Sequence, residues 1–280
     1  MTQNDHALRT MCEEGNFRIL LANTTDTVAA VLDAQSPAED TRKLFADLVT
    51  ASVLLRLTMS PDNRLQAIVQ NRAIGSLVGD SHPDGITRGL VRQRGDTPLT
   101  LGDETYLSVH RTMFGGDVHQ GVVETSADQS LADAVSGYLH RSEQITSVVG
   151  LGHRFDGDEL IFAGGYIIQI LPADDEIDHA TLAIMTARLQ NLPGVAQLFE
   201  DSDFDSEKVA DTLFGPLDFR TLGQNDFHAG CICSPERVLG ALATLSDADR
   251  AELTADGETL EIDCEYCGTT HRIEPDALAG

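Results

Sequence analysis

The chain has 280 residues, of which 41% are hydrophobic, and this is enough to build at least one sizeable core. Its 45 acidic residues outnumber 19 basic ones, and the net charge of −26 should repel nucleic-acid backbones and anionic membrane surfaces. We therefore expect binding to neither nucleic acid nor membranes. No eighteen apolar residues run together and no apolar stretch follows a basic start, so we expect a soluble, cytoplasmic protein.

The first part of the chain alternates strand-like and helical segments. Residues 17–21 are apolar and predict a strand, whereas residues 38–58 repeat apolar side chains at three- and four-residue steps and predict a long helix. A turn follows at Pro61-Asp62-Asn63. Residues 65–70 and 107–110 have the composition and alternation of strands.

Glycines punctuate residues 75–102 and predict turns between antiparallel strands. A second helix is expected to begin at Ser130 and to continue through Leu139. The apolar run 164–171 ends at Pro172, and we expect it to be a buried strand that closes an N-terminal domain spanning residues 1–172. The predicted fold class is α+β, with layered sheets and helices in this domain.

The composition changes after Pro172. Between residues 174 and 211, ten acidic residues face only Arg188 and Lys208 as fixed cations. Helical spacing recurs at residues 182–189 and 209–214, but the apolar faces are thin and the like charge is heavy. Helices of this kind should be marginally stable and held by docking onto another element.

We therefore assign residues 173–229 to a helical linker, which is either a solvated acidic connector or a conditionally folded segment. The remaining tail, residues 230–280, has few large apolar side chains. A piece of this size needs a staple, and four thiolates around zinc supply an apparent folding free energy of about 10–16 kcal/mol. The tail should unfold when its metal is removed.

Four of the five cysteines lie in this tail as two close pairs, Cys231/Cys233 and Cys264/Cys267. Two such pairs can close a tetrahedral Zn²⁺ shell, and His271 is a weaker competitor for one position. The site is either a plain structural zinc ribbon or a redox switch. A disulfide across the single residue between Cys231 and Cys233 would form a small strained ring that is easily reduced, which suits reversibility.

Other chemistry has no visible basis in the sequence. Cys12 has only Arg9 as a nearby cation and is interpreted as an incidental or half-buried residue. The histidines form no metalloprotease-type pair, and neither a serine nucleophile elbow nor a phosphate-binding Gly-Lys-Ser loop is present. We therefore do not expect an enzyme.

The sequence around the cysteines resembles the zinc switch of the bacterial redox-regulated heat-shock holdases, the 33 kDa chaperonins. Further segments resemble blocks of the same family, in the same order and at similar separations. The segments that carry the resemblance are Gln120-Gly121-Val122-Val123, Arg141-Ser142-Glu143-Gln144, residues 163–172, residues 231–237, Asp256-Gly257-Glu258 and residues 264–268.

The resemblance implies an N-terminal domain of layered sheets and helices, a helical linker lying on it, and a small zinc-binding domain. It also implies an ATP-independent holdase that is quiescent when reduced and zinc-bound. On oxidation such a protein forms a disulfide within each cysteine pair, releases zinc, unfolds its linker and binds unfolding client proteins. By position, the zinc ligands and redox cysteines are Cys231, Cys233, Cys264 and Cys267.

The family further implies a monomer in the reduced state and a homodimer after oxidation. A different class of protein fits the residues as an alternative: a non-catalytic, protein-binding adaptor in which a constitutive zinc module only holds structure. The extra Cys12 and the presence of only two lysines, Lys43 and Lys208, depart from the family pattern.

Overall fold

The structure, a computed structural model, describes residues 5–12, 16–95, 97–171 and 179–278. Contacts between residues divide the chain into two compact units, Met1–Ala229 and Gly230–Gly280. Helices and sheets occur together in both, so the predicted α+β fold class is confirmed. Among the described residues, no helix has the length and hydropathy required to cross a membrane.

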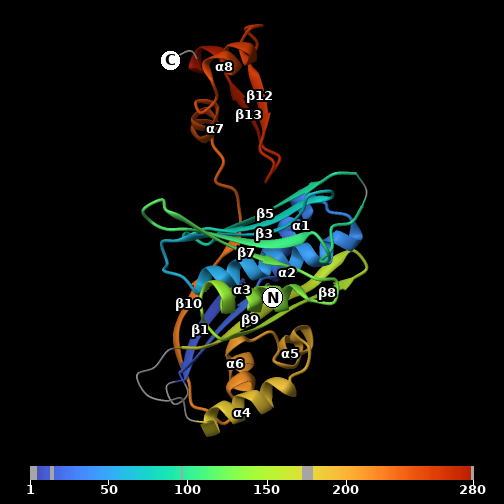
Figure 1. The fold of residues 1–280 in the computed structure, drawn as a ribbon, viewed down its shortest axis with the longest axis vertical. Helices are drawn as coiled ribbons and strands as arrows, with labels where there is room; N and C mark the ends of the chain where they lie inside the picture. Colours follow the sequence, from blue (N-terminus) through green and yellow to red (C-terminus); the bar gives the residue numbers. More distant parts are fainter. Residues whose placement is uncertain (1–4, 13–15, 96, 172–178, 279–280) are drawn as a thin grey trace. The chain divides into compact units, whose positions relative to one another are not determined.

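The first unit contains two sheets (Figure 1). Neighbouring strands are antiparallel except for β11 and β5, which are parallel. The five-stranded sheet has the order β10 (Arg220–Asp226), β1 (His6–Cys12), β2 (Phe17–Asn23), β9 (Glu159–Ile170) and β8 (Ser147–Asp156). The six-stranded sheet has the order β11 (His228–Ala229), β5 (Ile86–Gln93), β4 (Gly75–Ser81), β3 (Arg64–Asn71), β6 (Thr105–Thr112) and β7 (Val118–Glu124).

Three helices fill the space between the two sheets: α1 (Thr25–Gln35), α2 (Glu39–Leu57) and α3 (Leu131–Ser142) (Figure 1). The helix α2 is apolar on most of its surface because both sheets pack against it. Its Phe45 and Leu48 join residues of both sheets in an apolar cluster, which we call the central cluster. The N-terminus of α3 is fixed by a capping box between Ser130 and Asp133.

The opposite face of the five-stranded sheet is covered by α4 (His179–Gln190), α5 (Val195–Asp201) and α6 (Ser206–Phe214) (Figure 1). Fully buried residues of these helices, such as Phe199 and Leu213, meet Ile19 and Phe162 of the sheet in a second apolar cluster, which we call the outer cluster. The acidic helices are therefore docked on the sheet through well-buried apolar side chains, as expected for helices of marginal intrinsic stability.

The expected strands and helices of residues 17–171 are present. The apolar run expected to close the domain belongs to β9, which lies inside the five-stranded sheet between β2 and β8. The unit is completed later in the chain, because β10 pairs with β1 and β11 pairs with β5. An interior position explains the unbroken burial of β9, since both of its faces are covered by apolar clusters.

The second unit is small. It contains α7 (Pro235–Leu242), α8 (Asp247–Leu253), the hairpin of β12 (Leu260–Asp263) with β13 (Thr270–Ile273), and the 3₁₀ turn Pro275–Leu278. Within the described part of this unit, Ile273 and Leu278 are the only apolar residues that are fully buried. So small a core cannot offset the conformational entropy of about fifty ordered residues.

Candidate metal centre

The two cysteine pairs are held by two short turns. Cys231 and Cys233 precede α7, whose N-terminus is capped by Ser234 through a hydrogen bond from the backbone N–H of Arg237. Cys264 and Cys267 occupy the turn between β12 and β13. In that turn the N–H of Gly268 donates to the carbonyl of Cys264 at 2.8 Å, and its φ of +70° favours glycine. Each turn therefore presents two sulfur atoms on one side.

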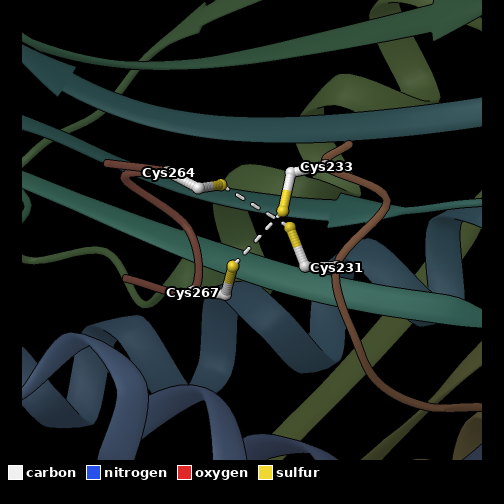
Figure 2. Close-up of side chains that lie close together, drawn as sticks. All are labelled: Cys231, Cys233, Cys264 and Cys267. Atoms are coloured by element: carbon white, nitrogen blue, oxygen red, sulfur yellow. Dashed lines mark hydrogen bonds between the residues drawn. The ribbon is translucent and has the colours of Figure 1, made fainter. Parts of the chain in front are cut away.

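The four sulfur atoms converge on one point (Figure 2). All lie within 4.8 Å of one another, and the residues are thiols rather than disulfides. The Sγ atoms of Cys231 and Cys264 are 3.6 Å apart, as are those of Cys233 and Cys267. A tetrahedral shell with Zn–S bonds of about 2.3 Å has S–S edges of about 3.8 Å, so the observed spacing fits that ion.

The thiols differ in acidity. Burial opposes ionisation of Cys267, yet hydrogen bonds with the hydroxyl and backbone of Thr269 lower the pKa of Cys267 to about 6. Burial, followed by hydrogen bonds with neighbouring thiols, raises the pKa of Cys233, and burial likewise raises the pKa of Cys264. The thiol of Cys267 thus ionises more readily than those of Cys233 and Cys264, whose surroundings resist ionisation. A divalent cation would remove that resistance by compensating the charge of additional thiolates.

The structure thus brings together all four sequence-predicted residues, which form a group able to hold a metal ion. His271 is not a member of this group. It lies buried on β13, and its Nε2 has no hydrogen-bond partner among the described residues. Cys12 is fully buried in the outer cluster of the first unit and lies outside the four-sulfur group.

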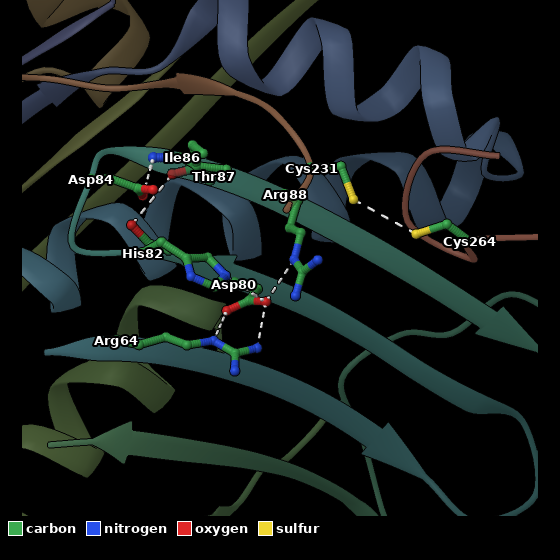
Figure 3. Close-up of polar contacts among 10 residues, drawn as sticks. Arg64, Asp80, His82, Asp84, Ile86, Thr87, Arg88, Cys231 and Cys264 are labelled. Carbon is green, nitrogen blue, oxygen red and sulfur yellow. Dashed lines mark hydrogen bonds and ion pairs between the residues drawn. The ribbon is translucent and has the colours of Figure 1, made fainter. Parts of the chain in front are cut away.

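A second polar centre, which the sequence did not indicate, surrounds Asp80 in the first unit (Figure 3). The Asp80 carboxylate has no exposed surface and accepts two hydrogen bonds from Arg64 at 2.7 Å and one from Arg88 at 2.9 Å. His82 lies 3.2 Å away. Burial opposes ionisation, but hydrogen bonds with His82 and Arg64 outweigh it and hold the pKa of Asp80 well below its usual range. The three strands β3, β4 and β5 are thereby joined by one buried carboxylate.

Comparison with known proteins identifies the family. A model of the Hsp33 protein family matches residues 5–274. The chain belongs to the Hsp33 family. The curated 33 kDa chaperonin of Streptococcus gordonii is 27% identical over 292 aligned residues, covering 98% of this chain and 97% of the relative. That of Syntrophotalea carbinolica is 26% identical and covers 98% of both chains.

The fold is also that of a solved Hsp33 structure. The crystal structure of the 33 kDa chaperonin from Thermotoga maritima matches with a TM-score of 0.80 and 17% sequence identity, covering 99% of this chain and 97% of that chain. Hsp33 membership thus extends across both units and includes the four-cysteine cluster. This Hsp33 chain is a chaperone-family protein with a site that could hold a metal ion.

Proposed function

We propose that this Hsp33 protein is a redox-regulated, ATP-independent holdase that prevents aggregation of unfolding proteins. The observation that carries the proposal is the four-sulfur cluster inside a unit that has almost no apolar core. A unit of this kind depends on its thiolates for folding, so a change in their oxidation state becomes a change in structure. Membership of the Hsp33 family supports the chaperone activity itself.

In the reduced protein, we assign one Zn²⁺ to Cys231, Cys233, Cys264 and Cys267. The bound ion supplies the folding free energy that the second unit lacks. The proposed organisation has three parts: an N-terminal domain of residues 1–172, a metastable linker of residues 173–229 and a zinc-binding switch of residues 230–280. The buried apolar side chains of α5 and α6 support the linker assignment. While these helices are docked they cover a large apolar surface, and that surface would be exposed if they detached.

The activating step is the oxidation of the cysteines by a peroxide. In each pair, Cys231 with Cys233 and Cys264 with Cys267, two thiolates lose two electrons and form one S–S bond. One hydrogen peroxide accepts those electrons and, with two protons, leaves as two molecules of water. Disulfide sulfurs no longer hold the metal ion, so the second unit loses its staple and unfolds.

We propose that the linker unfolds together with the tail, and that α4, α5 and α6 leave the five-stranded sheet. This exposes the outer cluster, including Phe162 and Ile19 of the sheet and Phe199 of α5, to unfolding client proteins. We propose a monomer in the reduced state and a homodimer after oxidation, without a catalytic role and without nucleic-acid or membrane partners. A reducing cytoplasm suits a switch that rests as free thiols.

The direct test treats the reduced protein with peroxide at mild heat. Zinc release, loss of thiols and suppression of light scattering by a heat-denatured client are expected to appear together. The alternative, a non-catalytic adaptor with a constitutive zinc module, predicts that zinc stays bound. Zinc release without any gain in anti-aggregation activity would also defeat the holdase proposal.

A Cys264→Ser variant tests the ligand assignment. Zinc affinity should fall and binding of clients by the reduced protein should rise, because the second unit loses one of its four thiolates. Cys12→Ser is the matched control for zinc affinity alone, since Cys12 lies in the first unit and outside the four-sulfur group. Unchanged zinc stoichiometry in Cys264→Ser removes Cys264 from the ligand set.

The disulfide pairing needs its own measurement. The two 3.6 Å sulfur contacts run between the motifs, from Cys231 to Cys264 and from Cys233 to Cys267, whereas the proposed disulfides form within each motif. Peptide mapping of the oxidised protein should recover Cys231 linked to Cys233 and Cys264 linked to Cys267. Recovery of the cross-linked pairs instead would show that the sulfurs oxidise in their present arrangement and that the pairing proposed here is wrong.

A further inference from the structure

Three arginines of the first unit lie on α2 or on the face of the five-stranded sheet that packs against α2. Arg9 lies on β1, Arg18 on β2 and Arg56 in the last turn of α2. Side chains alternate between the two faces of a strand, so Arg9 shares a face with Ala7, and Arg18 shares a face with Leu20. Ala7 and Leu20 both belong to the central cluster, on the face that packs against α2. The arginines of the sheet therefore face the helix that carries the third.

Strand register and charge bring these arginines together. Arg9 is opposite Leu20 and Arg18 is opposite Met11, which makes the two arginines diagonal neighbours on adjacent strands. Long side chains reach one another across such a diagonal. Burial, and then repulsion by Arg9, lower the pKa values of both Arg18 and Arg56. Arg9 thus lies within electrostatic range of both partners.

None of the three forms an ion pair within the described part of the chain. Arg18 donates to the neutral side-chain oxygen of Gln169, and Arg56 donates to the backbone carbonyls of Pro61 and Pro83. The Nε atoms of Arg9 and Arg56 are buried and have no hydrogen-bond partner among the residues that the structure describes. Buried donors of charged groups cost free energy when they are left unsatisfied.

Among the described residues, neighbouring acids do not neutralise the positive charge of these arginines by ion pairing. Asp62 and Asp84 attract Arg56 at longer range, but neither makes an ion pair with it among the described residues. The contrast with Asp80 is direct, because there two arginines share one buried carboxylate.

We propose that Arg9, Arg18 and Arg56 form a binding site for a compact oxyanion of the phosphate class. The planar guanidinium fork matches the geometry of phosphate oxygens, and an anion would compensate three neighbouring positive charges. The net charge of −26 repels long polyanions, so the site selects a small ion over a nucleic-acid chain. The proposal concerns the first unit alone and does not depend on the chaperone activity.

Isothermal titration of the full-length, reduced, zinc-loaded protein tests the site. Orthophosphate and pyrophosphate are titrated at constant ionic strength in chloride buffer, and saturable binding with one ion per chain is expected. Arg9→Gln should weaken binding by about tenfold or more, because it removes a guanidinium fork from the site. Arg94→Gln is the matched control: Arg94 donates to the carbonyl of Arg72 on an exposed loop and should leave the affinity unchanged.

Absence of binding by both phosphates overturns the proposal. A loss of affinity in Arg94→Gln equal to that in Arg9→Gln also overturns it. ATP as a third titrant distinguishes the source of the phosphoryl group. Equal affinity for ATP and pyrophosphate assigns the site to nucleotide phosphates, and binding of the inorganic ions alone assigns it to free phosphate. Binding of citrate as tight as that of phosphate would instead show a general anion site and overturn the phosphate assignment.

Thermal unfolding provides a readout in which a merely structural arginine would behave differently. In chloride, Arg9→Gln should melt at the same temperature as the unchanged protein or higher, because one of three repelling charges is gone. Phosphate should raise the melting temperature of the unchanged protein and of Arg94→Gln, but not that of Arg9→Gln. Arg18→Gln is the second variant; because it also removes the hydrogen bonds to Gln169, only its response to phosphate is compared, and phosphate should not raise its melting temperature. A melting temperature that falls in chloride, with full stabilisation by phosphate retained, contradicts the proposal.

Discussion

The two units of the chain hold themselves together by different means. The first unit buries apolar side chains in two large clusters, one between its sheets and one beneath α4, α5 and α6. The second unit fully buries only Ile273 and Leu278 among its described apolar residues, and instead gathers four sulfur atoms within 4.8 Å. Hydrophobic burial depends little on redox conditions, whereas thiolates are directly open to oxidants. We therefore expect the second unit to be the part whose stability responds to oxidants.

Removal of the metal should produce the largest difference between the units. A strong chelator applied to the reduced protein should unfold the second unit, since structural zinc supplies about 10–16 kcal/mol of apparent folding free energy. Backbone hydrogen exchange should then show full loss of protection in β12 and β13, with β2 and β9 still protected. Added zinc should restore the protection. Unchanged exchange in β12 and β13 would show that the second unit folds without a metal.

Within the first unit, the largest single-residue effect is expected at Asp80. Asp80→Asn leaves Arg64 and Arg88 without their buried counter-charge and should destabilise the unit by about 3–5 kcal/mol in denaturant unfolding. Asp158→Asn is the matched control, because the Asp158 carboxylate is almost fully exposed beside Arg42 and its loss should change stability little.

The effect of Asp80 should also depend on pH in a defined direction. The folded-state pKa of Asp80 lies below its unfolded value, so its contribution is complete above the unfolded pKa of about 3.9. The contribution is lost as the pH falls through the lower folded-state pKa. The difference in unfolding free energy between Asp80→Asn and the unchanged protein should therefore shrink on acidification. A constant difference down to strongly acidic pH would contradict this assignment.

A smaller effect is expected from a change that weakens the attachment of α4 and α6 to the first unit. Arg188 of α4 donates to the carbonyls of Thr212 and Leu213, at the end of α6. Arg188→Gln should weaken the docking of these helices by about 1.5–3 kcal/mol, the usual contribution of hydrogen bonds that involve a charged group. Hydrogen exchange of α6 and client binding by the reduced protein should both increase.

Lys208→Gln removes the same charge from the same acidic stretch and is the matched control. Lys208 pairs with Asp203, and both groups are exposed to solvent, so its loss should leave hydrogen exchange of α6 unchanged. Gly215→Ala tests the same contact without changing Arg188. A Cβ on Gly215 would lie 2.2 Å from the Arg188 guanidinium carbon and would crowd it. Equal effects of Arg188→Gln and Lys208→Gln would mean that net charge alone controls these helices.

Sequence patterns predicted the features that depend on local order. The periodicity of residues 38–58 gave α2 within one residue at each end, and the cysteine spacing identified all four sulfurs of the cluster. The helix α5 has only seven residues, too few for a periodic pattern to be recognised. The Asp80 centre joins residues of three strands, and its partners lie up to sixteen positions away. Such contacts arise only from strand register, which single residues do not reveal.

Residues 173–229 include the strands β10 and β11, so their detachment would change more than the apolar surface that they cover. β10 is the outermost strand beside β1, and β11 is the outermost strand beside β5. If residues 173–229 detach, each sheet loses one of its two terminal strands, and β1 and β5 are left with rows of unpaired backbone N–H and C=O groups. An extended polypeptide can then add to the protein by main-chain hydrogen bonding, independent of its side-chain sequence. Such a surface would accept clients that share no motif.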